Sequence, residues 1–164
     1  MVIVLGIDPG LANTGFGVVQ RRPRDLVALD GGVIATGARE PLADRLTRIH
    51  RVVSELLEHY RPDAVSMESL YFGRNATSAL AVGQARGVAL LAAAQRGIDC
   101  VDYTPQQIKG AVCGRGGADK AQVQRMVQAL LRLDAPPTPD HAADALAAAI
   151  CHANHAPLRA ALSA

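Results

Sequence analysis

Aromatic residues are scarce in this chain of 164 residues, which has no Trp, three Tyr and two Phe. Its core must therefore be built from Val, Leu, Ile and Ala. Cysteines are few as well: Cys100, Cys113 and Cys151 are odd in number, widely spaced and outside any Cys-x-x-Cys or Cys/His metal motif. This pattern does not fit a disulfide framework or a zinc site, and it favours reduced thiols in a cytoplasmic protein.

Long hydrophobic runs are also missing from the sequence. No apolar run approaches the ~20 residues that a membrane span requires, so we expect no membrane association. The first apolar run lacks a basic segment in front of it and is broken by Asp8, Pro9 and Gly10. A signal peptide has the opposite features, so we expect none here.

Neither sign of charge is in large excess, because 17 basic and 15 acidic residues leave a formal net charge of +2. That balance alone is weak evidence for an anionic partner. Of the basic residues, however, 15 are Arg, and only Lys109 and Lys120 are Lys. A compositional bias toward Arg explains most of this count. It also singles out the two lysines, since Lys offers a compact, mobile charge that Arg does not.

The hydrophobic pattern predicts one α/β domain over residues 1–156 and a frayed C-terminal tail at 157–164. Three strand-like segments joined by short turns predict an antiparallel meander, with a β-bulge at Gly31 and Gly32. Strand and helix patterns then alternate, which predicts a five-stranded mixed sheet flanked by helices. The expected strands are 2–8, 14–20, 26–36, 64–68 and 98–103, and helices are expected to begin near residues 42, 74, 105, 120 and 140, the last ending near 153.

Two of the expected strands end on a carboxylate. Asp8 follows the apolar run at the start of the chain, and Glu68 follows the strand at 64–68. If these strands are parallel neighbours, both acids emerge at one sheet edge, where open α/β sheets place their ligands. An acid at the end of a core strand is costly to bury without a compensating partner such as a cation.

The last expected helix adds further donors in the segment Asp-His-Ala-Ala-Asp at 140–144. His141 and Asp144 are spaced i,i+3 and share a helix face, on which Asp144 lies among apolar residues. Asp140 follows Pro139, which is typical of a helix start, although its i,i+4 spacing to Asp144 would also let it share that face. Together with Asp8 and Glu68, these residues predict an oxygen-rich site suited to Mg²⁺ or Mn²⁺.

Several segments, taken in this order, resemble the RuvC family of bacterial Holliday-junction resolvases. They are Leu-Gly-Ile-Asp-Pro-Gly at 5–10, Met-Glu at 67–68, Asn-Ala-Thr-Ser-Ala-Leu at 75–80, Gly-Gln-Ala-Arg-Gly-Val at 83–88 and Asp-His-Ala-Ala-Asp-Ala-Leu-Ala at 140–147. The resemblance runs from residue 2 to about residue 155. It implies a ribonuclease-H-like fold and a homodimer that nicks a four-way DNA junction symmetrically with Mg²⁺, in DNA recombination and repair, leaving 5′ phosphates. It also suggests the branch-migration proteins RuvA and RuvB as partners.

Carried onto this sequence, the family's acidic centre falls on Asp8, Glu68, His141 and Asp144. His141 is a departure, because many relatives have Asp there, and imidazole suits Mn²⁺ better than Mg²⁺. The resemblance implies two metal ions, with Asp8 between them, Glu68 on one, and His141 and Asp144 on the other. Such ions activate the attacking water and stabilise the leaving 3′ oxygen.

Other residues are expected to handle DNA. The resemblance places functional lysines at Lys109 and Lys120, although exposed lysines are usually only solvated. Adjacent rings at Tyr71 and Phe72, the first matching a family aromatic, favour base stacking at an opened junction, unless they pack into the core. Arg74, beside them, and Arg115, in a Gly-rich loop, are further candidates for DNA contacts.

Gly83 and Gly87, four residues apart on the second expected helix, permit close packing against the sheet or, as the resemblance favours, against a second subunit. Two other functions remain open at this point. One is a non-catalytic four-way-junction DNA-binding protein of the same fold. The other, an actin-like or sugar-kinase-type phosphotransferase fragment, needs two such domains, and 164 residues without a repeat do not supply them.

Overall fold

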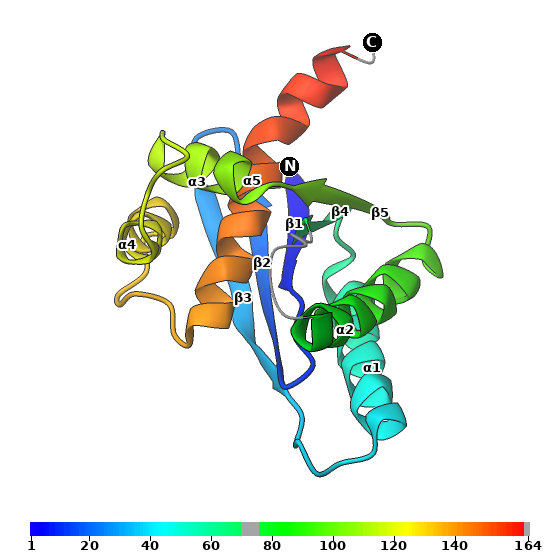
Figure 1. Cartoon of the computed structure of the whole chain (residues 1–164). Coiled ribbons are helices and arrows are strands. Elements are labelled where there is room, and N and C mark those ends of the chain that lie inside the picture. Colours follow the sequence, from blue (N-terminus) through cyan, green and yellow to red (C-terminus); the bar gives the residue numbers. More distant parts are fainter. Residues whose placement is uncertain (70–75, 163–164) are drawn as a thin grey trace.

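The order of secondary structure matches the expected one. The computed structural model describes residues 1–69 and 76–162, with the backbone alone after residue 155. Its elements are β1 (Val2–Asp8), β2 (Asn13–Arg21), β3 (Leu26–Ala35), α1 (Leu42–Tyr60), β4 (Ala64–Glu68), α2 (Ala76–Ala94), β5 (Asp99–Tyr103), α3 (Pro105–Cys113), α4 (Lys120–Leu131) and α5 (Asp140–Leu162) (Figure 1). The prediction of an α/β fold with a five-stranded mixed sheet is confirmed.

The sheet has the strand order β3-β2-β1-β4-β5. β1, β2 and β3 form the expected antiparallel meander, whereas β4 runs parallel to β1 and β5 runs parallel to β4. Ile7 of β1 pairs with Met67 of β4, so the next residue of each strand, Asp8 and Glu68, leaves the sheet at the same level. The parallel arrangement therefore brings two strand-end carboxylates to one edge.

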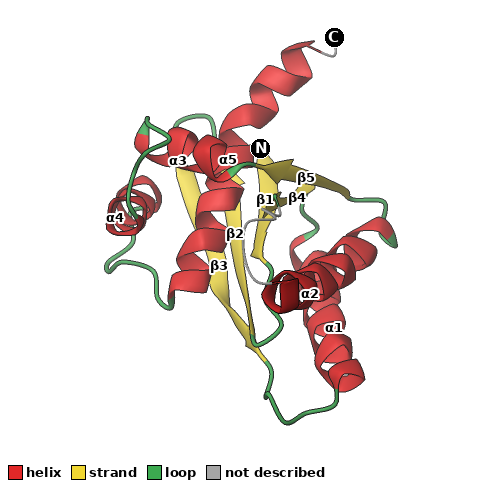
Figure 2. Ribbon diagram, in the orientation of Figure 1, coloured by secondary structure: helices red, strands yellow, loops and turns green. Residues whose placement is uncertain are grey.

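Helices cover both faces of the sheet (Figure 2). On one face, α3, α4 and α5 pack over a core that includes Val4 and Val19. On the other, α1 and α2 pack over a core that includes Leu5, Ile7 and Val18. Successive residues of a strand point to opposite faces, so β1 contributes to both cores in alternation. The same alternation places Asp8 on the face that α5 covers.

α5 approaches the sheet closely because small residues line the contact. A Cβ on Gly6 would lie 1.9 Å from the carbonyl oxygen of Ala145, and a Cβ on Gly15 would lie 2.0 Å from that of His141. The facing side of α5 is rich in buried alanines, among them Ala142 and Ala149. The close contact brings the first turns of α5 against the end of β1.

Two details of the backbone differ from expectation. The irregularity in β3 is at Leu29 instead of Gly31 and Gly32, because Val18 and Val19 pair with Asp30 and Ala28 and leave Leu29 without a partner. The Asp30 side chain accepts hydrogen bonds from the Gly31 backbone (2.8 Å) and the Tyr60 hydroxyl (2.8 Å), which anchors the chain beside this bulge. α5 also continues to Leu162, past the expected end near residue 153, since Ala, Leu and Arg after Pro157 favour a helix.

α2 corrects the expectation that no segment resembles a membrane span. Its 19 residues are long and apolar enough to cross a bilayer, by length and composition alone. Core helices of soluble proteins pass the same test, so this is weak evidence for a membrane. In this fold, Arg86 of α2 forms an ion pair with Asp102 of β5, and α2 packs on α1. α2 is thus part of the layer that covers the sheet.

The three cysteines are free thiols, as expected. Burial raises the pKa of Cys151 to about 12. Burial is also the largest of the causes that raise the pKa of Cys100 to about 11. A thiol that stays protonated is a poor nucleophile. Cys100 and Cys151 are therefore poor nucleophiles near neutral pH.

Substituting Gly6 with Ala tests the close contact of α5. We expect Gly6→Ala to lower the free energy of unfolding by about 2 kcal/mol or more, because the new methyl group meets helix backbone that cannot yield locally. The control is Gly110→Ala on α3, where a Cβ would meet no described atom within 4 Å apart from its chain neighbours and the backbone of its own helix. Gly110→Ala should instead raise the free energy of unfolding by about 0.5–1 kcal/mol, because Ala has the higher helix propensity. Denaturant unfolding measures both, and equal stability of Gly6→Ala and wild type would contradict the packing argument.

Candidate active site

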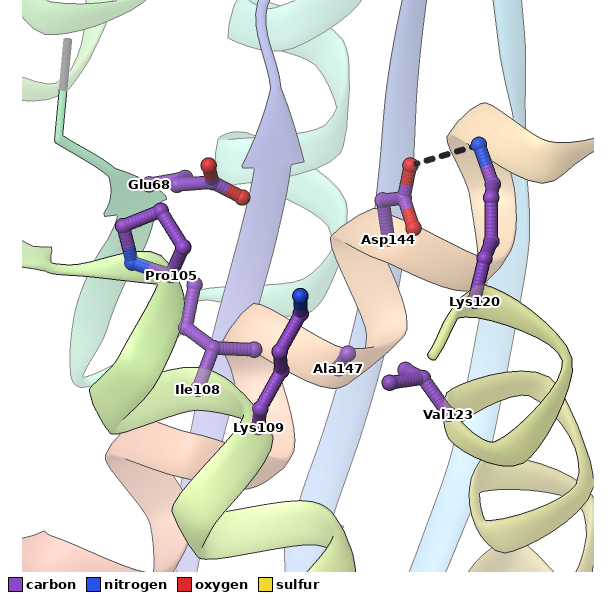
Figure 3. Close-up of a pocket in the computed structure, with 8 residues that line it drawn as sticks. All are labelled: Glu68, Pro105, Ile108, Lys109, Lys120, Val123, Asp144 and Ala147. Carbon is purple, nitrogen blue, oxygen red and sulfur yellow. Dashed lines mark ion pairs between the residues drawn. The ribbon is translucent and has the colours of Figure 1, made fainter. Parts of the chain in front are cut away.

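Carboxylates from three separate elements meet at the end of β1. Asp8 ends β1, Glu68 ends β4, and Asp144 lies in the second turn of α5. Glu68 and Asp144 line one side each of a pocket of about 360 Å³, and the Lys109 side chain lies between them in Figure 3. The other lining residues are Pro105, Ile108, Lys120, Val123 and Ala147. Asp8 does not line this pocket, but its charge acts on both Glu68 and Asp144, so the three carboxylates lie near one another as the sequence predicts.

The carboxylates oppose one another's ionisation. Burial raises the pKa of Asp8, Glu68 and Asp144, and it is the largest cause for each. The negative charge of Asp8 raises the pKa of Glu68 and of Asp144 further, and Asp144 adds to the effect on Glu68. An arrangement of this kind is stabilised by a nearby cation.

His141 lies directly beside Asp8. Its Nδ1 is 2.7 Å from Asp8 Oδ2, and this hydrogen bond lowers the pKa of Asp8 against the larger effect of burial. The imidazole remains 45% exposed, whereas the Asp8 side chain is 25% exposed. The packing of His141 backbone over Gly15 holds the ring at this place. His141 is therefore part of the cluster, in contact with the most central carboxylate.

Lys120 and Asp140 form a bridge between α4 and α5. Lys120 Nζ lies 3.1 Å from Asp140 Oδ2 and 3.5 Å from Asp144 Oδ2 (Figure 3 shows the second contact). Gln124 Nε2 also donates to Asp140 Oδ1, at 2.8 Å. Asp140 is the first residue of α5, and its carboxylate contacts α4 instead of Asp8. Its geometry therefore fits the predicted helix start better than a ligand position.

Both lysines are positioned by helix starts. Lys120 is the first residue of α4 and follows the N-cap Asp119, which forms a capping box with Gln122. Lys109 lies on α3, whose N-cap Thr104 forms a second capping box. The charge of Lys109 lowers the pKa of Glu68, and that of Lys120 lowers the pKa of Asp144. The two lysines thus supply positive charge to different carboxylates of the pocket, Lys109 to Glu68 and Lys120 to Asp144.

The donor set fits a hard divalent cation. Three carboxylates with raised pKa values offer oxygen ligands of the kind that Mg²⁺ and Mn²⁺ prefer. Over residues 1–69 and 76–162, no three His, Cys, Asp or Glu side chains stand in positions that would hold one ion. Instead, His141 contacts Asp8 and Lys120 contacts Asp144. For a metal ion to bind here, the His141 and Lys120 side chains would have to turn away from Asp8 and Asp144.

The remaining predicted DNA contacts are only partly covered by the structure. Arg115 lies in the loop before α4, and its guanidinium donates to Gln122 Oε1 at 3.0 Å, which joins it to the capping box of α4. Tyr71, Phe72 and Arg74 lie outside the described residues. Sequence reasoning gave no role to Arg86, which contacts the backbone carbonyl of Glu68. The feature of the sequence that could have singled out Arg86 is that it is the one Arg in the Ala-rich helix α2.

Removing the charge of Glu68 tests the electrostatic crowding. The pKa of Glu68 is raised above its ordinary value of 4.5, so the folded protein keeps a proton that the unfolded chain has lost. Stability of the metal-free protein therefore falls as the pH rises from the ordinary range through the raised value. We expect Glu68→Gln to raise Tm at pH 7 and to lose that advantage near pH 4.

Thermal unfolding from pH 4 to pH 8 in a chelating buffer measures this effect. The matched control is Glu58→Gln on the exposed side of α1, which should leave Tm unchanged within about a degree, as surface substitutions usually do. A Glu68→Gln protein that is less stable than wild type at neutral pH would show that the carboxylate stabilises the fold without a metal.

Comparison with known proteins identifies the family. The family model described as "Crossover junction endodeoxyribonuclease RuvC" matches residues 4–152. The chain is 51% identical to the RuvC protein of Ruminiclostridium cellulolyticum over 153 residues, 93% of this chain and 92% of that one. It is 53% identical to the RuvC protein of Thermomicrobium roseum over 149 residues, 91% of each. Thermus thermophilus RuvC in complex with Holliday junction substrate has a similar structure, with a TM-score of 0.93, 41% identity and 97% of each chain covered. This chain belongs to the RuvC family of crossover junction endodeoxyribonucleases.

Proposed function

We propose that the cluster of Asp8, Glu68, His141 and Asp144 is the catalytic centre with which this endonuclease resolves Holliday junctions. Its family is that of the crossover junction endodeoxyribonucleases, and a relative of 41% identity has been solved with a Holliday junction. The observation that carries the assignment is that Glu68 and Asp144 line one pocket with two lysines, while the charge of Asp8 acts on both of these carboxylates. The non-catalytic and phosphotransferase alternatives do not fit this family.

Nuclease chemistry in this family implies a divalent metal. We propose two Mg²⁺ ions, with Mn²⁺ as a substitute, held by Asp8 between them, by Glu68 on one side, and by His141 and Asp144 on the other. Bound ions of this kind activate a water molecule and stabilise the leaving oxygen. The negative charge of Asp8 raises the pKa of both Glu68 and Asp144. This nearness to both carboxylates supports a position for Asp8 between the two ions. His141, already against Asp8, would then give up that hydrogen bond.

The two lysines would bind the phosphates on either side of the cut. Lys109 lies between Glu68 and Asp144 in the pocket, and Lys120 stands at the N-terminus of α4, where backbone N–H groups favour an anion. In the metal-free state Lys120 contacts Asp144. With Asp144 as a metal ligand, Lys120 would keep its shorter contact to Asp140 and would present its remaining N–H donors to DNA. Arg115, at the same end of α4, extends this basic surface.

The exposed face of α2 is the proposed homodimer interface. Leu80, Leu90 and Leu91 are 64%, 44% and 52% exposed, an unusual set for one helix of a monomer. A Cβ on Gly83 or Gly87 would meet no atom of the rest of the described chain within 4 Å, so these glycines do not serve close packing on the sheet. A two-fold dimer presents two active sites to two DNA strands, as paired nicking requires.

The remaining proposals concern the cell and the DNA. Tyr71, Phe72 and Arg74 are proposed to contact the unstacked bases of the junction. The chain is proposed to act in the cytoplasm, in homologous recombination and repair. RuvA and RuvB are its proposed branch-migration partners. Paired symmetric cuts with 5′ phosphates are the proposed products.

Cleavage of a synthetic four-way junction tests the catalytic centre. Asp8→Asn should lower the rate of paired nicking in Mg²⁺ by about 100-fold or more, because it removes charge stabilisation at the centre of the site. His141→Ala should also abolish cleavage, whereas Asp140→Ala should mainly loosen the start of α5. Strand-specific labels and a linear duplex control measure symmetry and selectivity. The reverse ranking of His141→Ala and Asp140→Ala would refute the ligand assignment.

A charge on the exposed face of α2 tests the dimer. Leu80→Glu should convert the protein to a monomer in light scattering, since a like charge would stand on both sides of a two-fold interface. Leu29→Glu is the matched control, because Leu29 is 37% exposed on β3, away from α2. Dimers that persist in Leu80→Glu, or that dissociate in Leu29→Glu, would place the interface elsewhere.

A further inference from the structure

Arg86 of α2 contacts two neighbouring strands, β4 and β5, near their ends. Its Nη2 lies 2.5 Å from each carboxylate oxygen of Asp102 on β5, and its Nη1 donates to the backbone carbonyl of Glu68 at 3.3 Å. The Arg86 side chain is only 15% exposed, although it comes from a helix with an open outer face. The Arg86 guanidinium thus contacts both Asp102 of β5 and Glu68, the last residue of β4.

These contacts occur where the sheet itself holds Glu68 least. β5 is an edge strand, and β4 ends at Glu68, which pairs with Tyr103. Beyond that pair, one backbone hydrogen bond from Ser69 to Tyr103, at 2.8 Å, continues the ladder. On the β1 side, the ladder ends one residue earlier, at Ile7 and Met67. The direction of the Glu68 side chain therefore depends on how firmly this strand end is held.

Arg is suited to this position by its shape. The planar guanidinium presents several N–H donors in a fixed fork, which lets one side chain bind a carboxylate and still reach a carbonyl. Lys, with a single mobile ammonium group, matches the charge but not the geometry. The charges that act on the Glu68 carboxylate are those of Asp8, Asp144 and Lys109, so Arg86 acts on the backbone of Glu68 and not on its ionisation.

We propose that Arg86, with Asp102, is a positioning residue that fixes the end of β4 so that the Glu68 carboxylate is held ready for a divalent metal ion. This inference rests on the proposed role of Glu68 as a metal ligand. Removal of a group that orients a metal-ligating residue typically lowers metal affinity by about 10–100-fold. The same helix that offers the dimer face on one side thereby supports the active site on the other.

Metal binding without DNA tests the proposal directly. Mn²⁺ affinity is measured by electron paramagnetic resonance on the full chain, for wild type, Arg86→Met, Arg86→Lys and Asp102→Asn. We expect Arg86→Met to bind Mn²⁺ about tenfold more weakly or worse, and the other two variants to fall between it and wild type. Affinity for a four-way junction, measured in a chelating buffer, should stay within about twofold of wild type, because Arg86 is not in the DNA-facing pocket.

Arg96→Met is the matched control, since Arg96 follows the end of α2 and bonds to Ser54 and Ala92 instead of to Glu68 or Asp102. Mn²⁺ affinity in Arg86→Met equal to that in Arg96→Met would overturn the proposal. If Arg86→Met fails to fold, Asp102→Asn decides, because it keeps the shape and loses the ion pair. Glu68→Gln separates the two claims: unchanged Mn²⁺ affinity there would refute the ligand role itself, whereas a loss there with none in Arg86→Met would refute positioning alone.

Discussion

The close contact of α5 with β1 and β2 is the constraint on which the site depends. Gly6 and Gly15 leave no side chain between the strands and the helix backbone, and alanines on α5 complete the fit. This contact sets Asp8 beside His141, from opposite ends of the chain, at 2.7 Å. A side chain at Gly6 or Gly15 would push α5 away from the sheet and separate Asp8 from His141. The geometry of the cluster therefore depends on this backbone packing.

The cluster of buried carboxylates opposes the stability of the fold at neutral pH. Burial and mutual repulsion raise the pKa values of Asp8, Glu68 and Asp144, which means that the folded chain resists holding them charged together. His141 and Lys120 offset part of that cost through contacts to Asp8 and Asp144. Clusters of this kind are common where a protein prepares a site for a ligand. A bound divalent cation would offset the rest of the repulsion among the three carboxylates.

α2 carries a proposed subunit contact and a proposed support of the active site on different sides of one helix. Its outer face carries Leu80, Leu90 and Leu91, which are exposed in the single chain. Its inner side carries Arg86, which contacts Asp102 and the carbonyl of Glu68. One rigid element therefore lies between a proposed subunit contact and a proposed metal ligand. The short distance through the helix makes both faces sensitive to its position.

The sequence by itself determined the order of strands and helices, because periodicity, turn residues and capping boxes such as Thr104 with Gln107 act over a few residues. Strand ends at Asp8 and Glu68 followed from the same local signals, and so did the shared face of His141 and Asp144. Only the tertiary structure decided that Leu29 forms the bulge, that Asp140 contacts Lys120, and that Arg86 contacts the backbone carbonyl of Glu68. These outcomes depend on which distant segments pack together, and no local pattern encodes that choice.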